Sequence, residues 1–330
     1  MKFQLDFNIE PFQFPFNHQQ KIMMVGSCFA ENIGLELKNN KFNVLENPNG
    51  ILYNPISISE CLINCIENKQ YTKEDLFQLN DVWYSWQHHS RYSDVNVEKA
   101  ISKINESTTQ AHKYLKTAEV LIITLGTSFV SVLTDIAITN QKGIVAANNH
   151  KAPLNWFERR MLKPEQIVMV LGTMLDKLGN FNSNIKVIFT VSPVRHIKEG
   201  LVENNRSKAV LIQALQVLFE KLEKLYYFPA YELVIDVLRD YRFFADDLLH
   251  PSKQAIEFVF DKFIKACTKI DTQNLMKEIQ KMNTAYHHKP FHPDTNQHKE
   301  FLKDQLKQVQ FLQKKYPYLN FKDEIKYFNS

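Results

Sequence analysis

The chain has 330 residues, 44% of them hydrophobic, with 40 basic and 36 acidic side chains that give a formal net charge of +4. This length and composition exclude a mostly disordered protein and indicate one domain of ordinary enzyme size with an appendage. The small charge, with lysines spread among acidic residues, argues against nucleic acid as the main partner.

The amino terminus and the cysteines bear on the compartment. Residues 1–16 lack a basic start followed by an apolar block, so we predict no export signal, and no apolar run reaches the roughly 18 to 20 residues of a membrane span. Four cysteines are too few and too scattered for a disulfide scaffold. They are Cys28, Cys61, Cys65 and Cys267. We therefore expect free thiols in a cytoplasmic protein that contacts no membrane.

The first predicted elements are a strand over residues 22–25 and a helix that runs to about residue 39. Ser27 lies in the tight turn between them, where unpaired N–H groups and the helix dipole favour developing negative charge. Ser27 is therefore the candidate nucleophile, and the alternative for a serine at this position is a helix N-cap. The adjacent Cys28 is a rival nucleophile, because a thiol at a helix start can be reactive.

Further short apolar runs predict four more strands. They lie at residues 42–45, 118–125, 185–191 and 232–237, with helices between them and a hairpin over residues 129–146. This alternation is typical of a three-layer α/β/α fold with a doubly wound, mostly parallel five-stranded sheet. The loops that follow the strands should then meet at one edge of the sheet, where such folds bind ligands.

Residues 270–330 differ from the rest of the chain. Two helical stretches, at about residues 272–286 and 296–315, flank the string HHKPFHPD. We expect residues 1–269 to form the α/β domain and residues 270–330 to form a helical extension packed on it. The sequence leaves open whether this extension also makes a homodimer. The histidines of the connector, His287, His288 and His292, stand beside prolines and suit an ordered loop better than a metal site, so we expect no metal or cofactor.

A second informative stretch is RDYRFFADDLLHPS, residues 239–252. Asp247 and His250 stand three apart in a loop before a helix. This spacing lets the carboxylate accept a hydrogen bond from one imidazole nitrogen while the other faces a serine, which fixes the tautomer of a general base. The alternative is a structural loop histidine.

Several strings in this order resemble the GSCFA-domain family, which belongs to the SGNH, or GDSL-like, hydrolase superfamily. They are GSCFAEN, NPNGILYNP, LGTS, TVSPVRH, YFPAYE and DYRFFADDLLHPS. The resemblance covers about residues 20–320, including the helical tail. The resemblance implies a flavodoxin-like α/β/α fold and a catalytic triad with Ser27 as nucleophile, His250 as base and Asp247 as acid.

The resemblance also implies an oxyanion hole. Its donors would be the N–H of Ser27, Gly50 at the place of the superfamily's glycine, and a third group at the place of an asparagine that this chain lacks. The Ser128 hydroxyl, the backbone amides of residues 126–128, or Asn54 is expected to substitute for that asparagine. One missing donor of this kind typically costs about 10² to 10³ in rate.

Candidate substrate contacts lie in an aromatic stretch and after the fourth strand: His88, His89, Arg91, Arg195 and His196. The alternatives are surface histidines in a hairpin and helix caps. The predicted activity is that of a serine esterase that hydrolyses a small acyl ester such as acetyl, or a carbohydrate-linked ester, through an acyl-enzyme. An acyltransferase with the same triad is the nearest alternative, and a ligand-binding module that has lost turnover is another.

Overall fold

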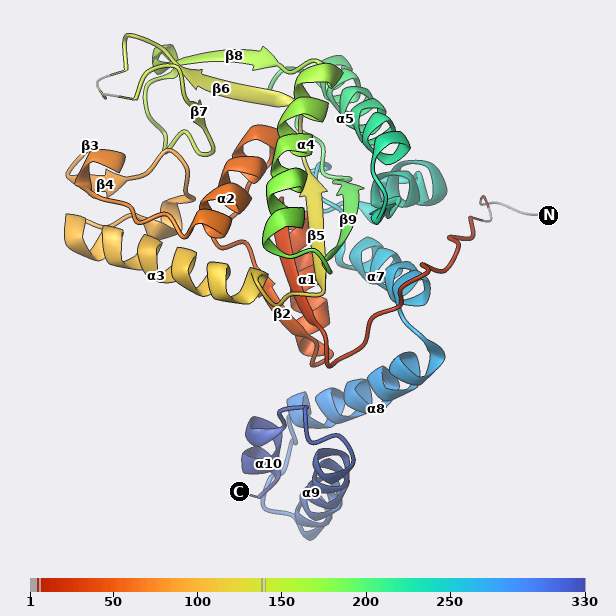
Figure 1. The fold of residues 1–330 in the computed structure, drawn as a ribbon. Coiled ribbons are helices and arrows are strands. Elements are labelled where there is room, and N and C mark those ends of the chain that lie inside the picture. The colour runs from red at the N-terminus through yellow and green to blue at the C-terminus, as the bar shows by residue number, and fades with distance from the viewer. Residues whose placement is uncertain (1–4, 6, 138, 140, 330) are drawn as a thin grey trace.

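A computed structural model describes residues 5, 7–137, 139 and 141–329 and shows a central sheet with helices on both faces (Figure 1). Parts of two predicted segments, the amino terminus and the hairpin over residues 129–146, lie outside the described residues. Among the described residues, no helix is long and apolar enough to cross a membrane. The four cysteines are free thiols, as predicted.

The central sheet is five-stranded and every pairing in it is parallel. In spatial order its strands are β10 (Leu225–Tyr227), β9 (Lys186–Val191), β5 (Val120–Leu125), β1 (Lys21–Gly26) and β2 (Asn43–Glu46). The first strand in the sequence, β1, is followed by β2 at one edge of the sheet; β5, β9 and β10 then follow in order on the other side of β1. The strand order therefore reverses between β1 and β5, and ligands of such sheets bind at this reversal, at the carboxyl ends of the strands.

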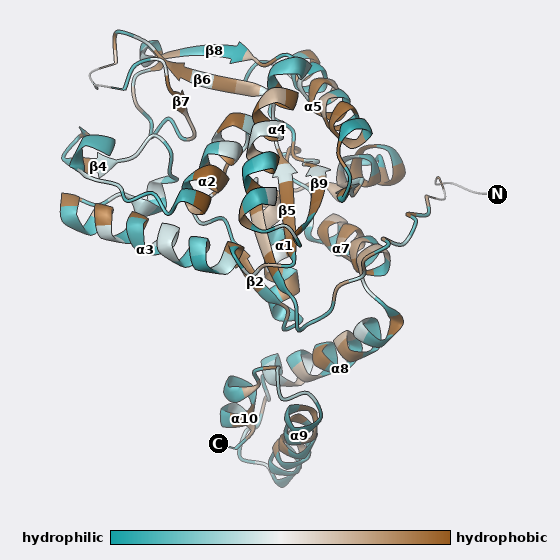
Figure 2. Ribbon diagram, in the orientation of Figure 1, coloured by the Kyte–Doolittle hydropathy of each residue, from teal (hydrophilic) through white to brown (hydrophobic). Residues whose placement is uncertain are grey.

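Helices cover the two faces of the sheet. One layer contains α2 (Pro55–Glu67), the end of α3 (Val97–Leu115), α4 (Pro164–Phe181) and α5 (Leu201–Lys221). The other contains α1 (Cys28–Asn39), α6 (Ala230–Glu232), the π-helical turn η4 (Leu233–Leu238) and α7 (Lys253–Cys267). Alternate side chains of β1, such as Met23 and Met24, enter opposite cores, because successive residues of a strand point to opposite faces. Figure 2 shows the resulting apolar strands between helices that are apolar on one side.

The predicted fold class is confirmed, but one strand prediction is wrong. Residues 232–237 form helical turns of α6 and η4, and the fifth strand is β10, at residues for which no strand was predicted. The run LVIDVL is buried in the core in its helical form. A short apolar run fits either a buried strand or a buried helix, so periodicity alone does not distinguish them.

Smaller elements surround the carboxyl end of the sheet. The predicted hairpin is present as β6 (Phe129–Leu133) and β7 (Val145–Ala146), joined by β8 (Phe157–Met161) in a separate antiparallel sheet. A further hairpin consists of β3 (Phe77–Leu79) and β4 (Val82–Tyr84). Single 3-10 turns are η1 (Lys73–Asp75), η2 (Ser90–Tyr92), η3 (Leu154–Trp156) and η5 (Tyr241–Phe243).

The carboxyl-terminal helices form a core of their own and pack at the opposite end of the sheet from the loops that follow the strands (Figure 1). They are α8 (Ile270–His287), α9 (Asn296–Lys315) and α10 (Lys322–Phe328). Lys41 Nζ lies 2.5 Å from Glu324 Oε1, and Asn283 Nδ2 donates to the carbonyl of Asn39 at 2.6 Å. These contacts attach the helices to the connection between α1 and β2.

Candidate active site

The structure brings Asp247 and His250 into direct contact. Asp247 Oδ2 accepts a hydrogen bond from His250 Nδ1 at 2.6 Å, and Oδ1 accepts from the N–H groups of Leu249 at 2.9 Å and His250 at 3.0 Å. The N–H donors of His250 and Leu249, followed by the His250 ring, lower the pKa of Asp247 to about 2. Because an ionised carboxylate only accepts, Nδ1 carries the proton and Nε2 of the neutral ring is left as the acceptor. This is the tautomer that a general base needs.

The loop that carries this pair is tightly closed. Leu248 adopts the left-handed conformation, with φ at 59°, and its N–H donates to the carbonyl of Ala245 at 2.8 Å. Ala245 in turn donates to the carbonyl of His250 at 2.7 Å. Both side chains of the pair remain 46% exposed, so the loop presents them to solvent while fixing their mutual geometry.

Ser27 lies between β1 and α1, as predicted, but it is fully buried. Its Oγ accepts from the Phe29 N–H at 3.3 Å, which is longer than a normal N–H···O bond, so it is a weak N-cap. The turn depends on Gly26, where a Cβ would lie 2.3 Å from the carbonyl oxygen of Thr124. Among the described residues, no hydrogen bond joins Ser27 Oγ to His250.

Cys28, the rival nucleophile, is held in an unreactive form. Burial raises the pKa of the Cys28 thiol above its ordinary value, so the thiolate is disfavoured at neutral pH. The position at a helix start does not overcome this desolvation. The chemistry of the turn therefore favours the serine over the cysteine.

The other expected oxyanion donors take part in bonds within the fold. The Gly50 N–H donates to the carbonyl of Asn47 at 2.8 Å. The Asn54 side chain caps α2, accepting from the Ser57 N–H at 2.9 Å and donating to Ser57 Oγ at 3.0 Å. Ser128 Oγ donates to Ser207 Oγ at 3.0 Å. The Gly50 N–H and the Ser128 hydroxyl would have to leave these bonds to reach a substrate, whereas the Asn54 amide has a second N–H beside the one that donates to Ser57.

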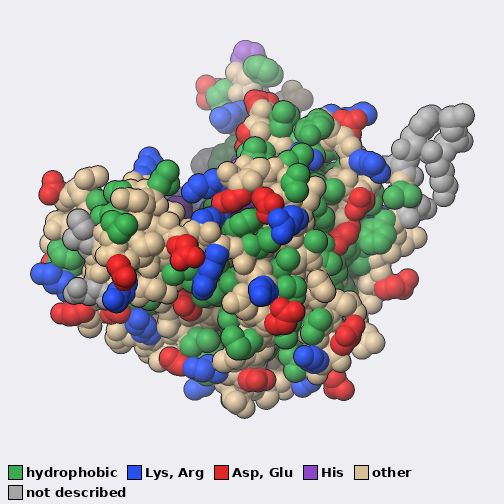
Figure 3. All heavy atoms as spheres, turned by 90° about the horizontal axis from the view of Figure 1, so that it is seen from above, with side chains coloured by type: hydrophobic (Ala, Val, Ile, Leu, Met, Phe, Trp, Pro, Cys, Tyr) green, Lys and Arg blue, Asp and Glu red, His purple; other side chains and the backbone are tan. Residues whose placement is uncertain are grey.

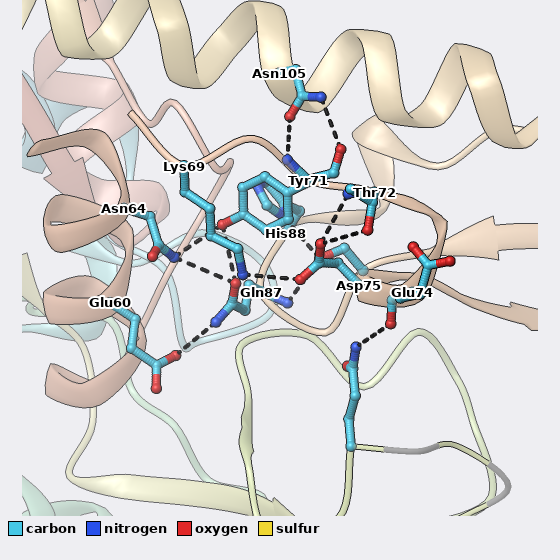
Figure 4. Close-up of polar contacts among 12 residues, drawn as sticks. Glu60, Asn64, Lys69, Tyr71, Thr72, Glu74, Asp75, Gln87, His88 and Asn105 are labelled. Atoms are coloured by element: carbon cyan, nitrogen blue, oxygen red, sulfur yellow. Dashed lines mark hydrogen bonds and ion pairs between the residues drawn. The ribbon is translucent and has the colours of Figure 1, made fainter. Parts of the chain in front are cut away.

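The prediction that His88 lines a pocket is wrong. Its side chain is 1% exposed, Nδ1 is 2.9 Å from Ser85 Oγ, and the ring packs edge-on against Tyr71. Burial is the main cause that lowers the pKa of His88 to about 3. Figure 4 shows the ring behind Tyr71, among polar side chains that bond to one another. His88 is a neutral core histidine.

His89 and Arg91 pack on the loop after β2 and do not stand free. Gly50 has φ at 81°, and a Cβ there would lie 2.2 Å from the Cβ of His89. Arg91 donates to the carbonyl of Asn47 at 2.6 Å and pairs with Glu31 at 3.1 Å. These two residues therefore shape the loop that contains Gly50.

Arg195 and His196 follow β9 and lie at the carboxyl edge of the sheet. Arg195 contacts the loop of Asp247 and His250 through the carbonyls of Leu248 and Leu249. The His196 ring packs edge-on against Tyr53, and a Cβ on Gly126 would lie 3.1 Å from its Nε2. Burial, with smaller contributions from Lys208, Arg159 and His250, lowers the pKa of His196 to about 3, so the His196 ring is neutral.

One residue at this edge was missed in the sequence. Lys208 of α5 is almost fully buried, and its Nζ donates to the carbonyls of Gly126 at 2.6 Å and Ser192 at 2.7 Å. It thus bridges the loops that follow β5 and β9, and burial lowers its pKa to about 7. The available signal was its spacing, since Asn204, Leu211 and Leu215 lie on the same buried side of the helix.

The surface over this edge carries charges of both signs. Figure 3 looks down on the carboxyl ends of the strands and shows basic and acidic side chains interspersed. Within the described part of the chain, no group of three or more His, Cys, Asp or Glu side chains could hold a metal ion.

Comparison with known families decides the assignment. The GSCFA family matches residues 21–263, and the GSCFA domain protein, C-terminal domain, matches residues 279–330. The chain belongs to the GSCFA family. The resemblance noted in the sequence strings is thereby confirmed, and the second match falls on the carboxyl-terminal helices.

Three solved structures are similar to this GSCFA protein at low identity. An acetyl esterase mutant with acetate ion has a TM-score of 0.38 and 11% identity, over 79% of this chain and 99% of that one. A carbohydrate esterase family 3 protein from Talaromyces cellulolyticus has a TM-score of 0.35 and 8% identity, over 78% of this chain and 99% of that one. The acetyl xylan esterase Est2A from the rumen bacterium Butyrivibrio proteoclasticus has a TM-score of 0.38 and 12% identity, over 74% of this chain and 63% of that one. No curated protein matches the chain.

Proposed function

We propose that this GSCFA protein is a serine ester hydrolase in which Ser27 is the nucleophile, His250 the general base and Asp247 its partner. The observation that carries the proposal is the Asp247–His250 pair, whose 2.6 Å bond and two backbone donors prepare the imidazole to accept a proton at Nε2. The substrate we propose is a small acyl ester such as acetyl, including carbohydrate-linked esters.

The reaction proceeds in two halves. His250 Nε2 takes the Ser27 hydroxyl proton as Oγ attacks the acyl carbon, and it then gives this proton to the departing alcohol. In the second half His250 deprotonates a water, which attacks the acyl-enzyme, releases the acid and restores the Ser27 hydroxyl. In this mechanism the N–H groups at the start of α1 stabilise the oxyanion that forms beside Ser27.

This mechanism requires a local rearrangement. Ser27 Oγ must turn away from the Phe29 N–H and meet His250 Nε2. The long N-cap bond of 3.3 Å opposes this only weakly. The exposed imidazole supports water as the acceptor of the acyl group; a sugar hydroxyl in its place would make the protein an acyltransferase.

A second candidate is a ligand-binding module without turnover. The burial of Ser27 and the internal bonds of Gly50, Asn54 and Ser128 favour it. Each absent oxyanion donor costs about 10² to 10³ in rate, so a site that keeps these bonds would turn over little.

The test is labelling with a fluorophosphonate together with hydrolysis of nitrophenyl esters from acetyl to octanoyl and of acetylated sugars. Ser27→Ala should abolish both. Ser252→Ala is the matched control, because Ser252 caps α7 through a bond of the same length, 3.3 Å to the Ala255 N–H. Undiminished labelling of the Ser27→Ala variant would refute the nucleophile. Labelling of Ser27 without hydrolysis of any ester would favour the binding module.

A further inference from the structure

Arg195 is fastened to the loop of the acid–base pair on several sides. Its backbone N–H donates to the carbonyl of Leu249 at 3.2 Å, and its Nη1 donates to the carbonyl of Leu248 at 2.9 Å. Its guanidinium lies 4.0 Å from the centre of the Phe244 ring and 5.1 Å from that of Tyr241. Within the described ranges no carboxylate pairs with Arg195, so its charge is directed to these carbonyls and rings.

These bonds are the hydrogen-bonded link between the loop and the sheet. The other hydrogen bonds of residues 245–250 run within the loop itself, from Ala245 to His250, from Leu248 to Ala245, and from Leu249 and His250 to Asp247. Among the described residues, Arg195 alone ties residues 245–250 by hydrogen bonds to a segment outside 241–252. That segment begins directly after β9, at the edge where Ser27 lies after β1.

The chemistry of the contact requires an arginine. A planar guanidinium can lie flat on Phe244 while it donates in its own plane to the Leu248 carbonyl, whereas an ammonium provides a point charge without a stacking face. Leu248, whose carbonyl accepts from Arg195, adopts a positive φ, a conformation that leucine rarely adopts without support from its surroundings.

We propose that Arg195 is a positioning residue: it holds residues 245–250 against the end of β9 so that the His250 imidazole keeps its place at the carboxyl edge. The proposal rests on the proposed function, in which His250 is the base. It revises the expected role of Arg195, which was substrate contact. Substitution of Arg195 leaves its backbone bond to Leu249 and removes the guanidinium contacts with Leu248, Phe244 and Tyr241. A misplacement of about 1 Å in a reacting group costs about 10² in rate, so loss of these side-chain contacts should affect kcat.

The experiment compares Arg195→Met, Arg195→Lys and Arg242→Met. Arg242 is the matched control because it lies within residues 241–252, beside the loop, pairs with Asp240 at 2.8 Å and lies 5.7 Å from the Phe243 ring, but among the described residues it makes no hydrogen bond to residues 245–250. With nitrophenyl acetate, Arg195→Met should lower kcat about 10²-fold and change KM little. Arg195→Lys should recover part of the loss, and Arg242→Met should match the wild type.

Amide hydrogen exchange supplies a readout that needs no activity. The amides of Leu248, Leu249 and His250 should exchange faster in Arg195→Met than in the wild type, partly recover in Arg195→Lys and stay unchanged in Arg242→Met. Unchanged exchange in both Arg195 variants would overturn the proposal, as would a raised KM with an unchanged kcat, which indicates substrate contact. If the wild type hydrolyses no ester, the proposed function fails, and the exchange rates still decide the role of Arg195.

Discussion

Two short contacts of nearly equal length lie at opposite ends of the central sheet, one a carboxylate–imidazole hydrogen bond and the other an ion pair, in different surroundings. At the carboxyl end, Asp247 and His250 are 2.6 Å apart and both 46% exposed. At the other end, Lys41 and Glu324 are 2.5 Å apart, and the Glu324 side chain is 5% exposed. Water screens the first pair, so its value lies in orienting a ring, whereas loss of one partner of the second would leave a charge in the interior.

The comparison shows that a short contact between a carboxylate and a nitrogen group can orient a reactive side chain when it is exposed and stabilise the fold when it is buried. The exposed pair can change protonation during a reaction at little cost to the fold. The buried pair attaches the carboxyl-terminal helices, with help from the Asn283 bond to Asn39 and from Phe321, whose ring centre lies 5.4 Å from Lys41 Nζ. Substitutions at the two ends should therefore separate activity from stability.

The largest expected effect is on activity, from Asp247→Asn. The amide no longer fixes the protonated Nδ1 or stabilises the imidazolium, so kcat should fall about 10⁴-fold, the loss that accompanies this change in a serine protease triad. Ester hydrolysis measures it, and thermal unfolding should show little change. Asp246→Asn is the control, since Asp246 is exposed and makes no hydrogen bond to His250 among the described residues. Equal losses in the two variants would contradict the assignment.

The next effect is on stability, from Lys41→Met at the other end. Removing one partner of a buried pair typically costs about 3 to 5 kcal/mol. Urea unfolding measures the change, and Lys41→Met combined with Glu324→Gln should restore part of the loss. Lys38→Met is the matched control, because Lys38 and Glu46 are 2.6 Å apart with side chains 39% and 23% exposed. It should cost about 1 kcal/mol or less. If the two single variants lose the same amount, burial does not distinguish the pairs.

The two ends also differ in how far the sequence reveals them. The apolar runs located four strands and the edge where their loops meet, and the spacing of Asp247 and His250 indicated their contact. The fifth strand was misplaced because LVIDVL fits either state, and the burial of Ser27 has no signature in the turn that contains it. Arg195 meets Leu248 across 53 positions, Lys208 meets Gly126 across 82, and Lys41 meets Glu324 across 283. Contacts that depend on the folded chain at such separations leave no local pattern.

A smaller effect is a loss of stability at acidic pH, to which one histidine at each end of the sheet contributes. His18 Nε2 donates to the Asn40 carbonyl at 3.0 Å, and burial lowers the pKa of His18 to about 4. Burial, with smaller contributions from Lys208, Arg159 and His250, lowers the pKa of His196 to about 3. Below the ordinary histidine pKa, these two histidines bind protons in the unfolded chain but stay neutral in the folded protein. The free energy of unfolding therefore falls as pH drops from about 6.5 towards 4.

Each of these two rings should contribute about 2 kcal/mol to the loss of unfolding free energy between pH 7 and pH 5. Urea unfolding at the two values, with His18→Gln and His196→Gln, separates the ends. Each variant should show a smaller difference between pH 7 and pH 5 than the wild type. His18→Gln should also lose stability at pH 7, because its ring stacks on Phe42 at 4.1 Å. A pH difference identical in variant and wild type would exclude that histidine as a source.

The smallest effect comes from Glu60, which belongs to neither end, and its sign is opposite. Glu60 lies on α2 with its carboxyl directed to Gln87 at 3.5 Å (Figure 4). Burial is the main cause that raises its pKa to about 7. Between pH 4.5 and 7 the unfolded chain loses this proton first, so stability declines as pH rises and stays lower above 7. Glu60→Gln removes the ionisation and keeps the shape. At pH 8 it should stabilise the protein by about 1 kcal/mol, since the cost of burying the glutamine amide offsets most of the roughly 3 kcal/mol that the raised pKa corresponds to, and at pH 5 it should have little effect. Urea unfolding at pH 5 and 8 measures both, and a variant less stable than the wild type at pH 8 would mean that the carboxylate is held by contacts stronger than the Gln87 amide.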